Sequence, residues 1–354
     1  MKSTSRSRLI FPFALLAAVL LWAAVCEFEG YLRRPLPIAE VQEVEVARGS
    51  TLGAVIREMA ARDLLQRPLL LQAYVRVSGR GHHIQAGEYL VGPGTTPLDL
   101  LDMLERGRVR THGVTFVEGW TLAQVRQLLA RDEHLQQQLR DVPNDRLLQA
   151  LGIDTEPGRQ PEGWFFPDTY VFSGKTSDRD ILLQAYRRML QVLEQEWPRR
   201  AGDLPYRSPY DALIMASIVE RETGVASERP QIAGVFVRRL QKDMLLQTDP
   251  SVIYGLGPAF DGNLRRRDLE DAANIFNTYL HPGLPPTPIA LPGREAIRAA
   301  LRPNGGTSLY FVARGDGSHQ FSSSLEEHNQ AVKKYQLNQR RADYRSSPGA
   351  PAKQ

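Results

Sequence analysis

The sequence predicts an α+β protein, and three observations lead to this fold class. The chain opens on a long apolar run, which predicts a transmembrane helix. Alternating strand patterns and amphipathic helical patterns then follow one another in a small β-α-α-β module. From about residue 161, helices alternate with loops rich in proline, glycine and aromatic residues. We therefore expect an anchor, a small module and a larger mixed α+β domain with a cleft.

Length, charge and cysteine content narrow the class of protein. With 354 residues, of which 42% are hydrophobic, the chain can fill two or three domain cores. The 44 basic and 40 acidic residues are interspersed, which argues against a nucleic-acid partner. Cys26 is the only cysteine, which excludes an intramolecular disulfide and a cysteine-ligated zinc site. The seven histidines lack the i, i+4 spacing of a metal-binding helix, so we expect no metal and no cofactor.

The first element is the uncharged run Leu9–Cys26, LIFPFALLAAVLLWAAVC. At about 1.5 Å per residue, its 18 residues nearly span a hydrocarbon core of about 30 Å. The run is longer than the apolar region of a signal peptide and no small-residue cleavage site follows, so we predict a retained anchor over residues 9–28. Basic residues before the run favour a cytoplasmic tail, residues 1–8, with the remaining chain outside the cytoplasm. These residues are Lys2, Arg6 and Arg8.

A repeated pattern predicts the small module over residues 40–110. Val44–Val55 reads VEVARGSTLGAV and Val114–Val125 reads VTFVEGWTLAQV. Each copy has an alternating strand, a glycine turn and a Thr-Leu pair, where the threonine caps an amphipathic helix. Between the copies come an apolar helix from Pro68, a strand in AGEYLV and a helix over Thr96–Gly107.

The order of strand, helix, helix and strand resembles the LysM fold, which binds amino-sugar glycans. Two interpretations of this LysM-like module stay open. It holds glycan, or it is a packing or spacer domain that makes no glycan contact.

The larger domain is predicted over residues 111–340. Its loops, such as PEGWFFPDTY and NTYLHPGLPPTPIALPG, are typical of segments that present functional side chains. Four helices are expected, at about residues 181–196, 210–222, 227–242 and 293–301. A hairpin over residues 308–322 then precedes a helix over residues 324–339. We expect Gly224 to end the second of the four helices and Ser227 to cap the third. The tail, residues 341–354, is too polar and proline-rich to fold.

Two glutamates end an otherwise apolar helix. In Ala212–Val219, ALIMASIV, only Ser217 is polar, so the helix is expected to be buried on all sides. At about 100° per residue, Glu220 and Glu222 point about 200° apart. At most one of them therefore faces a given cleft.

The position of the two carboxyl groups affects their pKa values. In the last turn of a helix a carboxylate feels the negative end of the helix dipole, and burial further disfavours its charge. Both effects raise the pKa, so such a glutamic acid can donate a proton near neutral pH. In the alternative interpretation, both glutamates pair with arginines such as Arg221 or Arg229 at a helix junction.

Four long motifs point to one family. ASIVERETGVASERPQIAGVFVRRL, LQTDPSVIYGLG and NTYLHPGLPPTPIALPG occur in this order behind the anchor, with EGWFFPDTY upstream. Together they resemble the MltG/YceG family of endolytic murein transglycosylases, from the anchor to about residue 340. The resemblance implies an inner-membrane enzyme whose catalytic domain, with a glycan cleft, acts on peptidoglycan strands in the periplasm. It also implies partners among wall-synthesis enzymes such as penicillin-binding proteins.

The resemblance further implies that Glu222, the second glutamate of E-x-E-T, is the catalytic acid, with Glu220 as a helper or structural partner. A lytic transglycosylase uses the C6 hydroxyl of muramic acid as nucleophile and forms a 1,6-anhydro ring. Because this attack is intramolecular, effective molarities of about 10⁵ to 10⁸ M can replace the second carboxylate of a glycosidase. One residue can then protonate the glycosidic oxygen and take the C6 hydroxyl proton.

Further polar and aromatic side chains are predicted to shape the cleft. Asp249 precedes Pro250 in a loop, where it can stabilise positive charge at C1 or can bond its own backbone in an Asp-Pro turn. Glu162 and Asp168 frame the aromatic residues GWFF, for which core packing and ligand contact both stay open. The predicted substrate-binding residues are Glu220, Thr223, Gln247, Thr248, Asp249, Asn277 and Tyr279.

Three functions remain open from the sequence. The first is a membrane-anchored lytic transglycosylase, and the second is a hydrolytic muramidase in which Asp249 or Glu220 activates water. The third is a non-enzymatic glycan-binding scaffold at sites of wall synthesis. The chain has no P-loop, no G-x-G-x-x-G and no G-x-S-x-G, so nucleotide and serine-hydrolase chemistry find no support.

Overall fold

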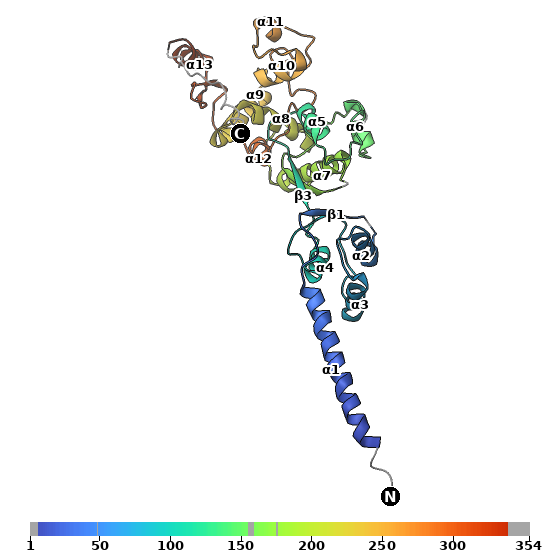
Figure 1. Cartoon of the computed structure of the whole chain (residues 1–354). Helices are drawn as coiled ribbons and strands as arrows, with labels where there is room; N and C mark the ends of the chain where they lie inside the picture. The colour runs from blue at the N-terminus through green and yellow to red at the C-terminus, as the bar shows by residue number, and fades with distance from the viewer. Residues whose placement is uncertain (1–5, 48, 155–158, 175, 339–354) are drawn as a thin grey trace. The chain divides into compact units, whose positions relative to one another are not determined.

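The structure is a computed structural model that describes residues 6–47, 49–154, 159–174 and 176–338 (Figure 1). Its contacts divide the chain into two units. The first is Met1–His112 with Val171–Lys175, and the second is Gly113–Tyr170 with Thr176–Gln354. The paired strands β3 (Thr111–Thr115) and β4 (Thr169–Ser173) each pass from one unit into the other. The predicted disordered tail, residues 341–354, lies outside the described residues.

The first unit begins with helix α1 (Arg6–Arg33), which starts before the apolar run and extends beyond it. The segment Leu15–Arg33 is long and apolar enough to cross a membrane, by its length and composition. The last turn of α1 belongs to the unit's core, since Tyr31 and Leu32 are buried there. Helix α1 and the module therefore share one core.

The module after α1 has the predicted order of elements. These are β1 (Gln42–Val46), α2 (Leu52–Ala61), α3 (Pro68–Ser78) and β2 (Gly87–Val91), with α4 (Pro97–Arg106) behind them. The two strands are antiparallel, with Gln42 opposite Val91 and Val46 opposite Gly87. The threonines preceding α2 and α4 cap these helices, because Thr51 accepts from the Ala54 N–H and Thr96 from the Asp99 N–H.

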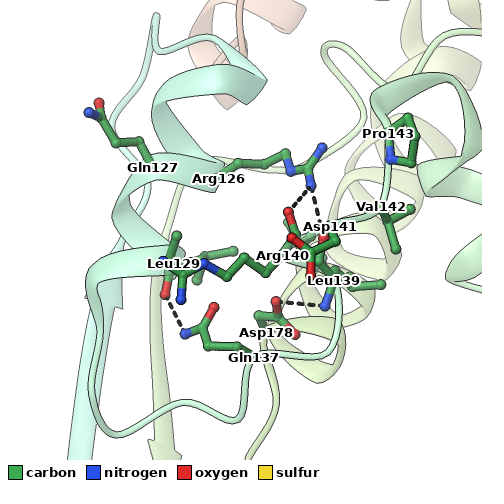
Figure 2. A pocket seen from close by; sticks show the side chains of 12 residues that line it. Arg126, Gln127, Leu129, Gln137, Leu139, Arg140, Asp141, Val142, Pro143 and Asp178 are labelled. Atoms are coloured by element: carbon green, nitrogen blue, oxygen red, sulfur yellow. Dashed lines mark hydrogen bonds between the residues drawn. The ribbon is translucent and has the colours of Figure 1, made fainter.

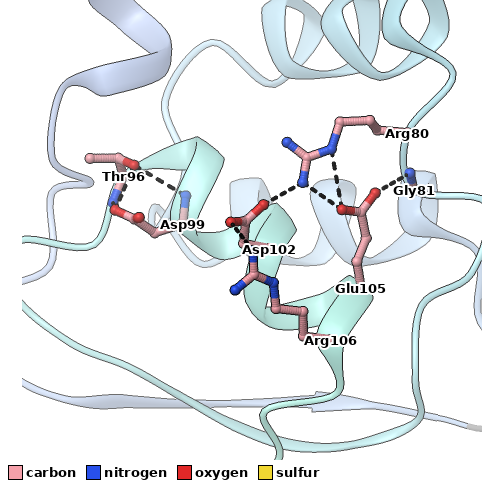
Figure 3. Close-up of polar contacts among 7 residues, drawn as sticks. All are labelled: Arg80, Gly81, Thr96, Asp99, Asp102, Glu105 and Arg106. Atoms are coloured by element: carbon pink, nitrogen blue, oxygen red, sulfur yellow. Dashed lines mark hydrogen bonds and ion pairs between the residues drawn. The ribbon is translucent and has the colours of Figure 1, made fainter.

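An ion-pair cluster fixes the loop between α3 and β2 to α4 (Figure 3). Arg80 donates to one oxygen of Glu105 from Nε at 3.2 Å and from Nη2 at 2.5 Å, and it also binds Asp102. The Gly81 N–H donates to the other Glu105 oxygen at 2.7 Å. Gly81 has φ +76°, and a Cβ there would collide with Leu52, so the loop lies directly against the start of α2.

The second unit is built around α8 (Pro209–Glu222). Every residue of Ala212–Val219 is buried, as the sequence predicts. Ser217 satisfies its hydroxyl by donating to the Ile214 carbonyl at 2.7 Å and accepting from the Ile289 N–H at 3.0 Å. The helices that pack with α8 are α9 (Arg229–Gln241), α10 (Asp249–Leu256) and α12 (Arg294–Leu301).

Shorter elements and one long helix complete this unit. Helix α7 (Asp178–Glu196) packs against α12, and the β5–β6 hairpin is antiparallel, as predicted, with Tyr310 opposite Ser322. The helix after the hairpin is regular only to Val332 and continues as a π-helix over Lys333–Asn338. The remaining elements are α5 (Leu122–Arg131), α6 (Asn144–Ala150), α11 (Arg266–Leu269), β5 (Tyr310–Ala313), β6 (His319–Ser322) and α13 (Leu325–Val332).

Two predicted helix signals after α8 are wrong. The helix ends at Glu222, with Thr223 as its C-cap in an extended conformation (φ −142°, ψ 137°), so Gly224 does not stop it. The Thr223 hydroxyl accepts from the Val225 N–H at 2.9 Å and so forms the turn by itself. Ser227 lies inside a 3₁₀ turn, Ala226–Glu228, and α9 begins only after it.

Candidate active site

The end of α8 directs its two glutamates to different partners. Glu220 accepts from Arg229 Nη2 at 3.1 Å and from the Gly293 N–H at 2.9 Å, and its side chain is 5% exposed. Glu222 instead accepts from the Thr248 hydroxyl. The predicted divergence is therefore confirmed. Glu220 joins α8 to the starts of α9 and α12, since Gly293 is the N-cap of α12.

Two chain segments hold Thr248 against Glu222. The Gln247 N–H donates to the Thr278 carbonyl at 3.0 Å, and the Thr248 N–H donates to the Thr278 hydroxyl at 3.0 Å. Ser251 shares a further hydrogen bond of 2.9 Å with that hydroxyl. Gln247 has φ +52°, a left-handed conformation that these bonds maintain. The backbone therefore fixes the direction of the Thr248 hydroxyl, whose residue is 1% exposed.

Glu222 lies in a cavity of about 380 Å³, here called the Glu222 cavity. Its walls come from the end of α8, from α9, from the loop before α10, from Tyr279 and from the β5–β6 hairpin with the helix that follows. The lining residues are Glu222, Arg239, Leu246, Gln247, Asp249, Tyr279, Tyr310, Phe311, Val312, Ala313, His319, Leu325, His328, Val332 and Gln336.

The surroundings of Glu222 favour its protonated form. Burial raises the pKa of its carboxyl to about 7, against the hydrogen bond from Thr248, which lowers it. The negative charge of Asp249 raises the pKa further, while Arg221 and Arg239 lower it. The group can therefore donate a proton at neutral pH and can hold the charge left behind, because Thr248 donates to it.

The sequence predicts Asp249 in a loop, but in the structure it is the first residue of α10. It is exposed, lines the Glu222 cavity and accepts from the Tyr279 hydroxyl at 2.6 Å. Burial raises the pKa of Tyr279, and the charge of Asp249 adds to this effect. Tyr279 therefore stays a hydrogen-bond donor and orients the Asp249 carboxylate inside the cavity.

Three predicted substrate-binding residues have protein partners away from the Glu222 cavity. Glu220 bonds to α9 and α12, and Thr223, 2% exposed, bonds to the Val225 N–H. Asn277 is fully buried and accepts from the Tyr279 N–H at 3.1 Å. Its amide group donates to the backbone carbonyls of Asp268, Leu269 and Asp271. Their substrate contacts stay predictions, and the geometry gives each a role in holding the site's backbone.

The sequence analysis did not predict two charged or titratable residues that line the Glu222 cavity, Arg239 and His319. Arg239 is 7% exposed and donates to the Leu309 carbonyl at 2.7 Å, which ties α9 to the hairpin. His319 of β6 is held through Nδ1 by Glu228 at 2.8 Å. Arg239 and Leu309 lie 70 positions apart in the chain, and no local pattern links them.

Glu220 and Glu162 also have raised pKa values and lie outside this lining. Burial raises the pKa of Glu162 to about 7, although the Leu122 N–H donates to it at 2.9 Å and the Tyr254 hydroxyl at 3.1 Å. It connects the start of α5 to α10. The neighbouring aromatic residues Trp164, Phe165 and Phe166 are buried, which supports their interpretation as core residues.

A different cavity, of about 420 Å³, lies between α5 and the loop at residues 137–143 (Figure 2). Arg126 donates there to the Leu139 carbonyl at 2.8 Å and to Asn144 at 2.5 Å. Asp178 accepts from the Gln138 and Leu139 N–H groups at 2.9 and 3.0 Å. The charged groups of this cavity bind the backbone of the loop and so have a structural role. We therefore place the candidate active site in the Glu222 cavity.

Comparison with known proteins shows the family of this chain. Residues 44–334 match the model of the YceG-like family. The chain belongs to the YceG-like family. This YceG-like protein is 30% identical over 307 residues to the endolytic murein transglycosylase of Bacillus subtilis (strain 168), covering 82% of this chain and 84% of that relative.

More distant relatives carry the same description. This YceG-like protein is 24% identical to the endolytic murein transglycosylase of Streptococcus pneumoniae serotype 2 (strain D39 / NCTC 7466), covering 91% of this chain and 64% of that relative. The crystal structure of a yceG-like protein from Listeria monocytogenes superposes with a TM-score of 0.52 at 28% identity, over 82% of this chain and 99% of that one. The family expected from the motifs is therefore confirmed.

Proposed function

We propose that this YceG-like protein is a membrane-anchored lytic transglycosylase that cleaves the β-1,4 bond after N-acetylmuramic acid in peptidoglycan strands. In this proposal the products end in 1,6-anhydro-N-acetylmuramic acid, and Glu222 is the single general acid and base. The observation that supports it best is one carboxyl with a pKa of about 7, bonded to a buried threonine inside a cavity of suitable size. The names of the relatives agree with this reaction class.

The proposed reaction uses one carboxyl group twice, first as proton donor and then as proton acceptor. The Glu222 carboxyl donates its proton to the glycosidic oxygen as the bond from C1 breaks, and the Thr248 hydroxyl stabilises the carboxylate that results. Asp249, oriented by Tyr279, stabilises the positive charge that develops at C1. The Glu222 carboxylate then takes the proton of the C6 hydroxyl as its oxygen attacks C1 and closes the anhydro ring.

Hydrolysis by a muramidase is the second candidate, since Asp249 lies in the same cavity and can activate water. Glu220 is the weaker base for that reaction, because Arg229 and the Gly293 N–H occupy its oxygens. A non-enzymatic scaffold would not need a carboxyl with a raised pKa in a cavity.

The proposal includes the position of the enzyme in the cell. Residues 9–28 anchor it in the inner membrane, and the LysM-like module, residues 40–110, and the catalytic domain, residues 111–340, lie in the periplasm. Support comes from the apolar segment of α1 and from the basic residues before it. The module's two candidate roles are glycan holding and spacing, and wall-synthesis enzymes such as penicillin-binding proteins are the proposed partners.

The products distinguish these functions. We expect mass spectrometry of digested, uncrosslinked glycan strands to show 1,6-anhydro ends, with Asp249→Asn slower but giving the same ends. Reducing ends would establish the muramidase. If the strands stay intact although the protein is folded, the non-enzymatic scaffold is the remaining function.

The proposal predicts that activity falls as the pH rises. The proton donor is the protonated form of Glu222, and its pKa is about 7, so kcat/KM on glycan strands should decline as pH increases through that value. A profile measured between about pH 5 and 9 checks this. Activity that stays constant across the range would contradict a general acid with this pKa.

A substitution at Thr248 tests the origin of this pH profile. Its hydroxyl donates to Glu222 and lowers the pKa of that carboxyl. Thr248→Val keeps the side chain's shape and removes the donor, so the decline in activity should move to higher pH. An unchanged profile would mean that Thr248 does not influence the titrating group.

A further inference from the structure

Helix α3 of the first unit has an exposed apolar and basic surface. Leu69 is 75% exposed and Val77 is 89% exposed, and the exposed Ala73 lies between them at i+4 spacing. The three side chains therefore share one face of the helix. The stretch from residue 64 to 87 contains no aspartate or glutamate, and Arg76 is exposed on α3. Its other two arginines pair with acidic residues, Arg67 with Glu27 and Arg80 with Asp102 and Glu105.

This exposed face is not needed by the module's core. Leu71, 1% exposed, lies on the opposite side of α3 and packs inward with Tyr74 and Val75. The helix thus has a complete buried face and, in addition, an outward apolar stripe made of Leu69, Ala73 and Val77. A helix with such a stripe, an exposed arginine and no acidic residue is typical of surfaces that bind lipid.

Contacts with α1 place α3 at the end of the apolar run. Arg67 forms an ion pair of 2.8 Å with Glu27, and the Tyr74 ring lies 6.4 Å from that of Phe28. These two partners in α1 directly follow Cys26, the last residue of the run. At about 1.5 Å per residue, they are within a few ångströms of the boundary of the hydrocarbon layer.

Further contacts join the module to α1 and to the residues that follow it. The Tyr31 hydroxyl donates to the Gln66 carbonyl at 2.8 Å, next to the start of α3. Leu36 and Ile38, which follow α1, are buried in the module's core. Figure 1 shows α3 on the side of the module where α1 enters, with β1 on the opposite side. These contacts fix the position of α3 along the axis of α1.

We propose that α3 is an interfacial helix that lies on the lipid bilayer into which α1 inserts. Its stripe of Leu69, Ala73 and Val77 enters the boundary between headgroups and acyl chains, and Arg76 lies among the phosphate groups of anionic lipids. The bilayer is the expected partner because α3 contacts α1 at the end of the apolar run, where the surface of the membrane would lie. This inference rests on the proposed anchoring by α1 and is independent of the proposed reaction.

The arrangement would give the module two attachments to the membrane instead of one. A single helix leaves the module free to rotate and tilt, whereas α1 together with α3 fixes one face of the module on the bilayer. An exposed arginine is attracted to anionic lipid headgroups, so Arg76 contributes in the same direction as the apolar stripe.

Site-directed labelling of the full-length protein tests the inference. In a Cys26→Ser background, single cysteines at Leu69 and Val77 receive an environment-sensitive fluorophore, and a cysteine at Leu90 is the control. Leu90 is a leucine of the β1–β2 sheet and is 43% exposed. The proteins are reconstituted into vesicles of phosphatidylethanolamine and phosphatidylglycerol that contain a nitroxide-labelled lipid.

We expect the labels at positions 69 and 77 to show blue-shifted emission and quenching by the nitroxide, and the label at position 90 to show neither. Leaving out phosphatidylglycerol should weaken the quenching, as should Arg76→Gln. Labels at 69 and 77 that stay in water while the protein remains in the vesicles would overturn the inference. Loss of the protein from carbonate-washed vesicles would instead refute the anchoring, and a failed glycan assay would affect only the proposed reaction.

Discussion

Glu222→Gln is expected to lower turnover on glycan strands by about 10²- to 10⁴-fold, the usual contribution of general acid-base catalysis. Glutamine keeps the size of the side chain and still accepts from the Thr248 hydroxyl, but it has no proton to transfer. Folding should be preserved, because glutamine occupies the same space and burial already disfavours the ionised carboxylate. Release of 1,6-anhydro products and a thermal melt measure the two effects.

The matched control is the other glutamate of the same helix end. Glu220→Gln should retain most of the activity of the folded enzyme, since its oxygens bind Arg229 and the Gly293 N–H and not the Glu222 cavity. Strong product release by Glu222→Gln, or inactivity confined to Glu220→Gln, would reverse the assignment of the acid.

Glu196→Gln is expected to cost about 3 kcal/mol of the free energy of unfolding, as is usual when one partner of a buried ion pair is removed. The Glu196 side chain is fully buried at the end of α7. It accepts from Arg294 at 3.0 Å and Arg298 at 2.9 Å of α12, and from Arg302 at 2.8 Å. These bonds hold α12 on the helix layer that contains α8. Urea denaturation of the full chain in detergent micelles, at neutral pH, measures the loss.

Two comparisons make the Glu196 result specific. Glu295 pairs with Arg298 at 2.7 Å, but it is 61% exposed, so Glu295→Gln should cost less than about 1 kcal/mol. Burial alone would raise the pKa of Glu196, yet the bonds from Arg298 and Arg294 keep it below the usual value. Its stabilisation is therefore present above the pKa of an unfolded glutamate and is lost as the pH falls through the lower folded value. A stability difference that did not shrink in acid would contradict this origin.

Whether a feature of the site could be predicted from the sequence depends on how far apart the interacting residues lie along the chain. The divergence of Glu220 and Glu222 was predictable, because the turn per residue of a helix is a local property. Their different roles were not, because they depend on Arg229, Gly293 and Thr248, which belong to other segments. The same holds for Asn277, whose polar side chain suggests a sugar contact. In the structure its amide donates to the backbone carbonyls of Leu269 and Asp271.

The sequence by itself determined the long apolar segment near the N-terminus, the β-α-α-β order, the buried helix ending in E-x-E-T, the C-terminal hairpin and the family. These features depend on patterns within about ten to twenty residues, where hydrophobic period, caps and turn residues act on the nearby backbone. Only the tertiary structure decided that Arg239 and His319 line the same cavity as Glu222 and that burial raises the pKa of Glu222 to about 7. Burial and charge at a site are sums over segments that folding brings together from distant positions, and no local pattern contains that sum.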